Sequence, residues 1–373
     1  MGLLNFSPKQ KRNIGKILPF GILCFLFGVV WVIVERSLLG PLDHYPATGI
    51  PYEFLPALMT TSIGSLIFGL LVGSVEVLYI NKLFIKRPFG LKILIKTIIY
   101  ITSLAVFMIF LFIIFSLIMR QSSPFDSEQI TILLQFILSF SFWGVIVYMG
   151  ATLGVILFFS EVSDNLGQGV LTNFLTGKYH QSREEERIFM FLDMKSSTTI
   201  AEKLGHVRYY QLLNDYYADI TNAIIQTSGE IYQYVGDEIV VSWKMKEGLK
   251  NNNCLKCFFM IKKIFKIRSK NYMESYGLVP GFKAGFHFGM VTTGEIGVVK
   301  KEIIFTGDVV NTTARIQSLC NTNNVEILIS EDLLNVLQTP DEYTIREIGE
   351  CELQGKDERV KLHTVQLNNY LES

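Results

Sequence analysis

Four long apolar stretches in the first half of the chain constrain its fold more than any other feature. They cover residues 17–34, 55–80, 97–119 and 130–160, and Glu76 is the one charged residue within them. A helix needs about 20 predominantly apolar residues to cross the hydrocarbon core of a bilayer. We therefore expect residues 1–160 to form a membrane α-helical bundle of about four spans, with the lipid bilayer as its surroundings.

The distribution of basic residues predicts the orientation of this bundle. Lysine and arginine are concentrated before the first stretch (Lys9, Lys11, Arg12, Lys16) and between the second and third (Lys82, Lys86, Arg87, Lys92). Such loops stay on the cytoplasmic side. The sequence therefore predicts a multi-pass protein of the cell membrane with its N-terminus and C-terminal half in the cytoplasm. A cleaved signal peptide is the alternative for the first stretch, but further apolar stretches follow it.

Two features inside the second stretch leave alternatives open. Gly69 and Gly73 are four residues apart, a spacing that lets membrane helices approach closely, although glycine is also ordinary in membrane helices. Glu76 is a candidate functional carboxylate because acids are costly inside a bilayer. It lies near the cytoplasmic end of its span, so we expect it to reach the headgroups or to pair with Lys82.

Residues 161–187 are expected to be a coupling linker between the membrane domain and a second domain at 188–373. Flexible tethers are rich in glycine and serine, but this segment has an apolar centre at Val170, Leu171, Phe174 and Leu175. A passive spacer is the alternative.

Two acids in the second domain follow strand-like patterns. An apolar run at 189–192 leads to Asp193, and a Ser/Thr cluster behind it favours a helix start. Residues 231–234 alternate, turn at Gly236 and Asp237, and continue into an apolar run at 239–241, which predicts a β-hairpin with Asp237 at its tip. Carboxylates suit Mg²⁺, and helix N–H groups suit phosphate. The pair indicates a nucleoside triphosphate site, although either acid alone is more often structural.

The remaining pattern predicts an α+β fold. Helical periodicity covers 200–227 and 253–273, a further helix begins at Gly307 and Asp308, and short apolar runs at 282–291, 303–305, 325–330, 343–348 and 360–365 predict strands. Lys+Arg and Asp+Glu are both 34, a balance that argues against nucleic-acid binding. Cys254 and Cys257 have a CxxC spacing without a partner pair, so we expect thiols in a helix rather than a metal site.

With these residues assembled, the chain from about Arg187 onward resembles the class III nucleotidyl cyclase catalytic domain. Three motifs carry the resemblance: FLDMKSST at 191–198, YVGDE at 234–238 and GDVVNTTAR at 307–315. The resemblance implies a cytoplasmic α+β, ferredoxin-like cyclase domain. It also implies a lyase that converts ATP, or alternatively GTP, to the 3′,5′-cyclic nucleotide and pyrophosphate, working as a homodimer with two equivalent sites.

The resemblance also implies roles for particular residues. Asp193 and Asp237 match the acids that hold two Mg²⁺ or Mn²⁺ ions per site. Asn311 and Arg315 match the pair that positions the ribose and stabilises the transition state, and they lie four residues apart, on one face of the predicted helix. Lys356 matches a phosphate-contacting lysine. In this family the metal acids of one subunit face the Asn/Arg pair of the other.

The base-recognition positions depart from both family patterns. Gln233 stands where adenine-specific relatives have Lys, and Ile304 where they have Asp or Thr; the Glu and Cys of guanine-specific relatives are absent too. A glutamine amide both donates and accepts, and Thr306 is the nearest polar substitute for the second position. We prefer ATP as the substrate because the Glu and Cys that are typical of guanine-specific relatives are missing. The nucleotide-binding residues implied are Met194, Lys195, Ser196, Ser197, Thr198, Gln233, Gly236, Ile304, Thr306 and Lys356.

Three rival interpretations are weaker. A diguanylate cyclase has a similar sheet and hairpin, but its reaction does not require residues like Asn311 and Arg315 on a helix. An inactive cyclase-like sensor would be expected to have lost a metal acid or the arginine. A channel or transporter is supported by Glu76 alone. The sequence does not identify a ligand of the membrane domain.

Overall fold

The computed structural model describes residues 6–40, 43, 52–85, 87–120, 127–167, 169–338, 342–352 and 359–368. The chain divides into two compact units, one over residues 10–171 and one over residues 1–9 and 172–373. We call them the membrane unit and the sheet unit and describe each by itself.

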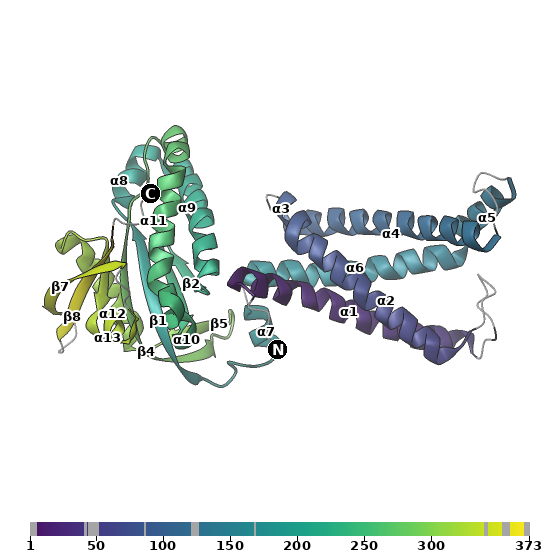
Figure 1. The fold of residues 1–373 in the computed structure, drawn as a ribbon, viewed down its shortest axis with the longest axis horizontal. Helices are drawn as coiled ribbons and strands as arrows, with labels where there is room; N and C mark the ends of the chain where they lie inside the picture. The colour runs from purple at the N-terminus through teal and green to yellow at the C-terminus, as the bar shows by residue number, and fades with distance from the viewer. Residues whose placement is uncertain are drawn as a thin grey trace. The chain divides into compact units, whose positions relative to one another are not determined.

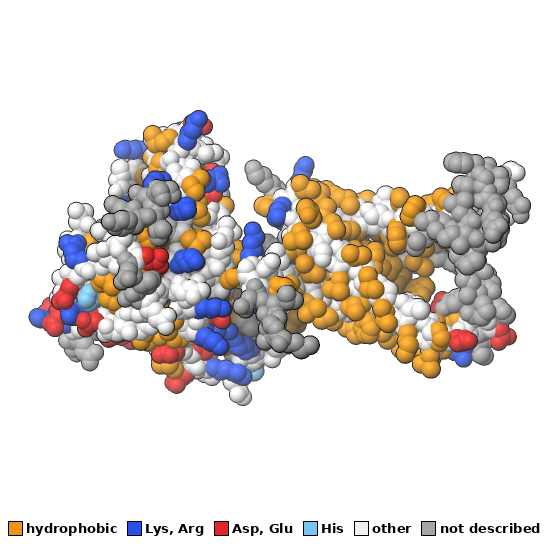
Figure 2. All heavy atoms as spheres, in the orientation of Figure 1, with side chains coloured by type: hydrophobic (Ala, Val, Ile, Leu, Met, Phe, Trp, Pro, Cys, Tyr) orange, Lys and Arg blue, Asp and Glu red, His pale blue; other side chains and the backbone are white. Residues whose placement is uncertain are grey.

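All regular secondary structure that is described in the membrane unit is helical (Figure 1). Its elements are α1 (Pro8–Leu39), α2 (Phe54–Val75), the π-helical turn η1 (Glu76–Ile80), α3 (Asn81–Leu83), α4 (Phe89–Arg120), α5 (Ser127–Leu138) and α6 (Phe140–Leu166). Four helical stretches among the described residues are long and apolar enough to cross a membrane, namely Pro8–Leu38, Phe54–Leu83, Phe89–Phe110 and Phe140–Leu166. Hydrophobic side chains cover the visible face of this unit (Figure 2). The expected four-span bundle is confirmed.

The fourth apolar stretch is divided into two helices at Ser139. The Ser139 backbone is extended (φ −70°, ψ 146°), and its Oγ accepts a hydrogen bond of 3.1 Å from the Phe142 backbone N–H. This is an N-cap, which ends α5 and starts α6. Apolar periodicity does not reveal such a break. α6 then continues to Leu166, beyond the predicted end of the stretch.

Gly69 and Gly73 lie where α1 and α2 approach closely. A Cβ atom at Gly69 would be 2.5 Å from the Phe20 carbonyl oxygen, and one at Gly73 would be 2.9 Å from the Phe20 Cβ. Any larger side chain would therefore push the two helices apart. Of the two interpretations of this glycine pair, the structure supports the helix contact.

The expectation for Glu76 is wrong. Its side chain is buried, with 2% of its surface exposed. Its carboxylate accepts hydrogen bonds from Lys96 (2.6 Å) and from the Tyr100 hydroxyl (2.8 Å) rather than pairing with Lys82. Both donors belong to α4, and a contact between separate helices is not visible in sequence spacing.

The sheet unit contains an eight-stranded sheet. Its strands are β1 (Arg183–Met194), β2 (Glu230–Val235), β3 (Glu238–Lys244), β4 (Phe282–Ile296), β5 (Glu302–Thr306), β6 (Ile327–Ser330), β7 (Tyr343–Glu352) and β8 (Arg359–Leu367). Its helices are α8 (Ser197–Leu204), α9 (His206–Gln226), α10 (Met245–Leu249), the 3₁₀ turn η2 (Lys250–Asn252), α11 (Asn253–Tyr276), α12 (Asp308–Thr322) and α13 (Glu331–Val336). The short α7 (Val170–Leu175) precedes β1.

The strand order is β2-β3-β1-β4-β6-β8-β7, with β5 paired to β4. All pairs are antiparallel except β4–β6. The first four strands, with α9 and α11, follow the β-α-β-β-α-β path of a ferredoxin-like fold. The expected α+β fold is confirmed. The helix predicted over 200–227 is divided at Gly205, where a φ of 73° is incompatible with a continuous helix.

The two faces of the sheet carry different layers. Ile188, Met190 and Leu192 of β1 belong to the main core together with residues of α9 and α11. These two helices lie against the sheet (Figure 1). Phe189 and Phe191 belong to a second cluster with Val309 of α12. Side chains alternate along a strand, so Asp193 lies on the α12 side.

Candidate active site

Asp193 and Asp237 meet at one end of the sheet. In the strand register Asp193 is opposite Glu238 of β3 and Lys283 of β4. Asp237 follows Gly236 in the two-residue turn between β2 and β3, where Gly236 has a φ of 62°. The Tyr217 hydroxyl donates to the Gly236 carbonyl oxygen at 2.8 Å and fixes this turn. The hairpin therefore places the Asp237 carboxyl group beside the end of β1, where Asp193 lies.

The two carboxyl groups are electrostatically linked. Burial raises the pKa of Asp193, and hydrogen-bond contact with the Asp237 carboxyl and its negative charge raise it further, while Lys283 opposes the shift. The Lys283 Nζ is 3.3 Å from Asp193 Oδ2, and the Gln317 amide of α12 donates to the same oxygen at 3.1 Å. The Asp193 carboxyl group therefore contacts three side chains, those of Asp237, Lys283 and Gln317.

Glu238 adds a third carboxyl group to this end of the sheet. Burial raises its pKa to about 7, with further contributions from the charges of Asp193 and Asp237. Among the described residues these three acids face one ammonium group, that of Lys283, so this part of the cluster carries excess negative charge at neutral pH. No group of three or more His, Cys, Asp and Glu within the described residues is arranged to hold a metal by itself. A carboxylate pair nevertheless fits Mg²⁺, which usually keeps waters and substrate phosphates as its other ligands.

We expect this acid cluster to make stability depend on pH. A carboxyl group whose pKa rises on folding stabilises the fold fully below its unfolded pKa, here the ordinary 4.5 of Glu238, and that stability is lost as pH rises through about 7. Thermal unfolding in EDTA should therefore occur at a lower temperature at about pH 8 than at about pH 5.5. Glu238→Gln should reduce this difference, and Mg²⁺ should raise the midpoint more at the higher pH. An equal response to Mg²⁺ at both values would contradict a cation site here.

Asn311 and Arg315 lie on the outer face of α12. Asn311 is exposed and Arg315 half-buried, and neither side chain has a hydrogen bond or ion pair with any residue that the structure describes. Gln317 is two residues beyond Arg315, or about 200° around the helix, and it is buried against the sheet. The inner face of α12 thus contacts Asp193, while Asn311 and Arg315 are available to a second molecule.

Lys283 and Gln317 are the site residues that the sequence reasoning missed. Each is an isolated polar residue in a strand or helix pattern. The sequence did contain one signal for Lys283. It is the second residue of the strand predicted at 282–291, and Asp193 is the last residue of another predicted strand. Antiparallel pairing of these strands brings the two together, but the pairing cannot be read from one sequence.

The segment after Asp193 lies partly in the core and partly at the surface. The Met194 side chain is buried in the main core. The Lys195 backbone N–H donates to the Gly281 carbonyl oxygen at 2.9 Å, and its ammonium group pairs with Glu326 at 3.4 Å rather than with either acid. Ser196, in the left-handed conformation (φ 56°), precedes α8, which begins at Ser197, with Thr198 exposed beside it.

The base-recognition positions belong to strands that contact each other. Gln233 is exposed on β2, after a register shift at Tyr232. The Tyr232 hydroxyl accepts a hydrogen bond of 3.2 Å from the Phe305 backbone N–H, and the two rings are 4.7 Å apart. Ile304 and Thr306 flank Phe305 on β5. The structure thereby joins the two segments to which sequence assigned base recognition.

Thr306 and Lys356 are the remaining residues for which the sequence predicts nucleotide contacts. The Thr306 hydroxyl donates to the Thr292 carbonyl oxygen at 3.2 Å. Lys356 lies outside the residues that the structure describes.

The fold and the site together define a chain with four candidate membrane helices and a ferredoxin-like domain that carries an acid pair at the ends of neighbouring strands. Residues 179–369 match the model of the adenylate and guanylate cyclase catalytic domain. The chain therefore belongs to this family.

Individual relatives agree with the family match. The chain is 36% identical to adenylate cyclase 2 of Rhizobium meliloti (strain 1021) over 217 residues, which are 58% of this chain and 60% of that protein. It is 28% identical to an adenylate cyclase of Anabaena cylindrica over 184 residues, 47% of this chain and 36% of that protein. The structure of a bacterial light-regulated adenylyl cyclase matches with a TM-score of 0.52 and 18% identity, over 62% of this chain and 68% of that one. This last likeness supports the fold.

Proposed function

We propose that this protein is a membrane-bound adenylate cyclase that converts ATP to 3′,5′-cyclic AMP and pyrophosphate. Family membership supports a nucleotidyl cyclase, and the first two relatives are named adenylate cyclases. The observation that carries the proposal is the contact between the Asp193 and Asp237 carboxyl groups, with Asn311 and Arg315 on the outer face of the neighbouring helix. The basic loops favour a cytoplasmic N-terminus and sheet unit.

The proposed chemistry assigns a task to each group. Asp193 and Asp237 would hold two Mg²⁺ or Mn²⁺ ions, which when bound acidify the ribose 3′-hydroxyl and neutralise the triphosphate. The 3′-oxygen attacks the α-phosphorus in line, its proton passes to solvent, and the bond from the α-phosphorus to the bridging oxygen breaks, releasing pyrophosphate. Asn311 positions the ribose. The guanidinium of Arg315 stabilises charge on the α-phosphoryl group with its fork of donors.

A homodimer is part of the proposal. One chain carries both the acid pair and the Asn/Arg pair, but α12 presents Asn311 and Arg315 on the face opposite to Gln317, which contacts Asp193. Two copies related by a twofold axis can each supply what the other lacks. Each dimer would then contain two equivalent sites.

Thr306 favours adenine over guanine. Its hydroxyl hydrogen is engaged by the Thr292 carbonyl oxygen, so it can only accept a further hydrogen bond. Position 6 of adenine carries an amino group that donates, whereas that of guanine carries a carbonyl oxygen that accepts. Gln233 can serve either base, so Thr306 decides the preference.

Replacement of Thr306 provides the test. The purified full chain with Mn²⁺ or Mg²⁺ should turn over ATP faster than GTP. Thr306→Val should lower kcat/KM for ATP about tenfold, the effect of one hydrogen bond, and should change that for GTP less. Thr306→Ser keeps the hydroxyl group and serves as the matched control. Faster product from GTP in the wild-type chain would replace the proposal with a guanylate cyclase, and a cyclic dinucleotide product would replace it with a diguanylate cyclase.

A further inference from the structure

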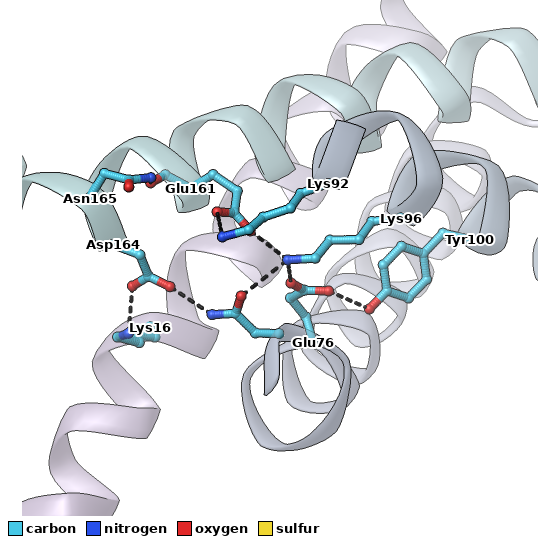
Figure 3. A network of polar contacts seen from close by, with 9 residues as sticks. Lys16, Glu76, Lys92, Lys96, Tyr100, Glu161, Asp164 and Asn165 are labelled. Carbon is cyan, nitrogen blue, oxygen red and sulfur yellow. Dashed lines mark hydrogen bonds and ion pairs between the residues drawn. The ribbon is translucent and has the colours of Figure 1, made fainter. Parts of the chain in front are cut away.

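A buried lysine in the membrane unit is held between two acids (Figure 3). The Lys96 Nζ of α4 has no exposed surface and donates to Glu76 Oε1 (2.6 Å), Glu161 Oε1 (2.5 Å) and Asn81 Oδ1 (3.2 Å). Glu76 belongs to η1, and Glu161 belongs to α6. One side chain of α4 thus connects the end of the second span to the end of the last.

A second set of polar contacts surrounds this centre. Lys92 of α4 pairs with the other oxygen of Glu161 at 3.5 Å. Asp164 of α6 accepts from Asn81 (2.8 Å) and from Lys16 of α1 (2.5 Å). With the Tyr100 bond to Glu76, every carboxylate in the cluster has two donors. We call the residues Lys16, Glu76, Asn81, Lys92, Lys96, Tyr100, Glu161 and Asp164 the ion lock.

The backbone of α2 is adapted to this cluster. Residues five apart in an α-helix are about 140° apart around the axis, so Glu76 and Asn81 could not both face Lys96. The π-helical turn η1 changes this, because the Asn81 backbone N–H donates to the Glu76 carbonyl oxygen, five residues back. Both side chains then point to the same ammonium group. Such turns are rare and are frequent at functional sites.

Bundle stability alone does not account for the ion lock. Removing several charges from water is costly, and apolar residues of similar volume often stabilise a buried position as well or better. The same bundle does pack apolar residues around it, including Leu153, Ile156 and Leu157 of α6. Three lysines and three acids in contact across four spans therefore call for another role.

The ion lock holds the last turns of the helix that leads to the sheet unit. Glu161 and Asp164 lie just before the end of α6 at Leu166, and the chain continues through α7 to β1, which carries Asp193. We propose that the ion lock couples the membrane unit to the cyclase: when it is closed it fixes the C-terminal end of α6, and when it opens that end is released and the rate of cyclic nucleotide formation changes. The activity readout rests on the function proposed above.

Matched variants of the full chain in membranes test this proposal. Lys96→Met removes the cation between Glu76 and Glu161 and leaves only Lys92 beside Glu161. We expect it to change activity per inserted molecule by at least about fivefold, the lower range of allosteric coupling, and to increase hydrogen exchange across residues 161–182. The variant Lys96→Met with Glu76→Gln and Glu161→Gln removes the repulsion and should return both readouts toward wild type.

Leu153→Ala is the control, because it opens a cavity in the same bundle without touching a charge. If it changes activity and exchange as much as Lys96→Met at an equal loss of thermal stability, the ion lock only stabilises the bundle and the proposal is wrong. Should Lys96→Met fail to insert, Tyr100→Phe removes a single bond to Glu76 and should shift both readouts in a smaller step; no shift would overturn the proposal. If the wild-type chain makes no cyclic nucleotide, the proposed function fails, and hydrogen exchange alone still decides the coupling.

Discussion

Chains with Asp193→Ala or Arg315→Ala are each expected to be inactive when expressed alone, and their co-expression is expected to restore cyclic AMP formation. Each variant lacks one half of the proposed site, the metal acid or the charge-stabilising arginine. In a mixed dimer, Asp193 of the second variant faces Arg315 of the first, so one of the two sites is complete. Random pairing of equal amounts leaves about a quarter of all sites intact.

The expected single-variant losses are large. Removal of one group that stabilises transition-state charge costs about 10²–10³ in rate, and removal of a metal acid should cost at least as much. Cyclic AMP per milligram of membrane protein measures the effect. Arg346→Ala and Asp332→Ala, at exposed positions of β7 and α13, are matched controls that should stay active. If the mixture remains inactive although crosslinking detects mixed dimers, the sites are not shared between subunits.

Local patterns in the sequence were sufficient for the elements that carry the acids. The apolar run before Asp193 and the Gly236–Asp237 turn are complete within a few residues, so strand and hairpin could be predicted and are observed as β1 and the β2–β3 hairpin. The spacing of Asn311 and Arg315 likewise predicted one helix face, and both lie on the outer face of α12.

Contacts between distant elements could not be predicted in the same way. Lys283 and Gln317 reach Asp193 only because β4 pairs with β1 and α12 packs on that sheet. Glu76 was assigned to the headgroups or to Lys82, the nearest cation along the chain, but its partner Lys96 lies on another helix. The π-helical turn η1 interrupts a helix that the apolar pattern predicts as continuous. Side-chain partners across elements therefore had to come from the structure.

The packing of α12 on β4 allows a sharp prediction at Gly285. A Cβ atom there would lie 2.7 Å from the Gln317 Cα and 2.8 Å from its Cβ. A main-chain atom cannot rotate away, so α12 would have to move, and Gln317, Asn311 and Arg315 would move with it. We expect Gly285→Ala to lower the free energy of unfolding by about 2–3 kcal/mol, as overpacked substitutions do, and to abolish most activity.

Gly289→Ala is the matched control on the same strand and the same face. Its added Cβ would be 3.4 Å from the Val309 Cβ, which is ordinary van der Waals contact with a side chain rather than with backbone. It should change the free energy of unfolding by less than about 0.5 kcal/mol and leave activity near wild type. Thermal unfolding of the detergent-solubilised chain and cyclic AMP formation measure both variants. Equal behaviour of the two would mean that the position of α12 over β4 does not set the geometry of the site, because only Gly285 is in contact with the helix backbone.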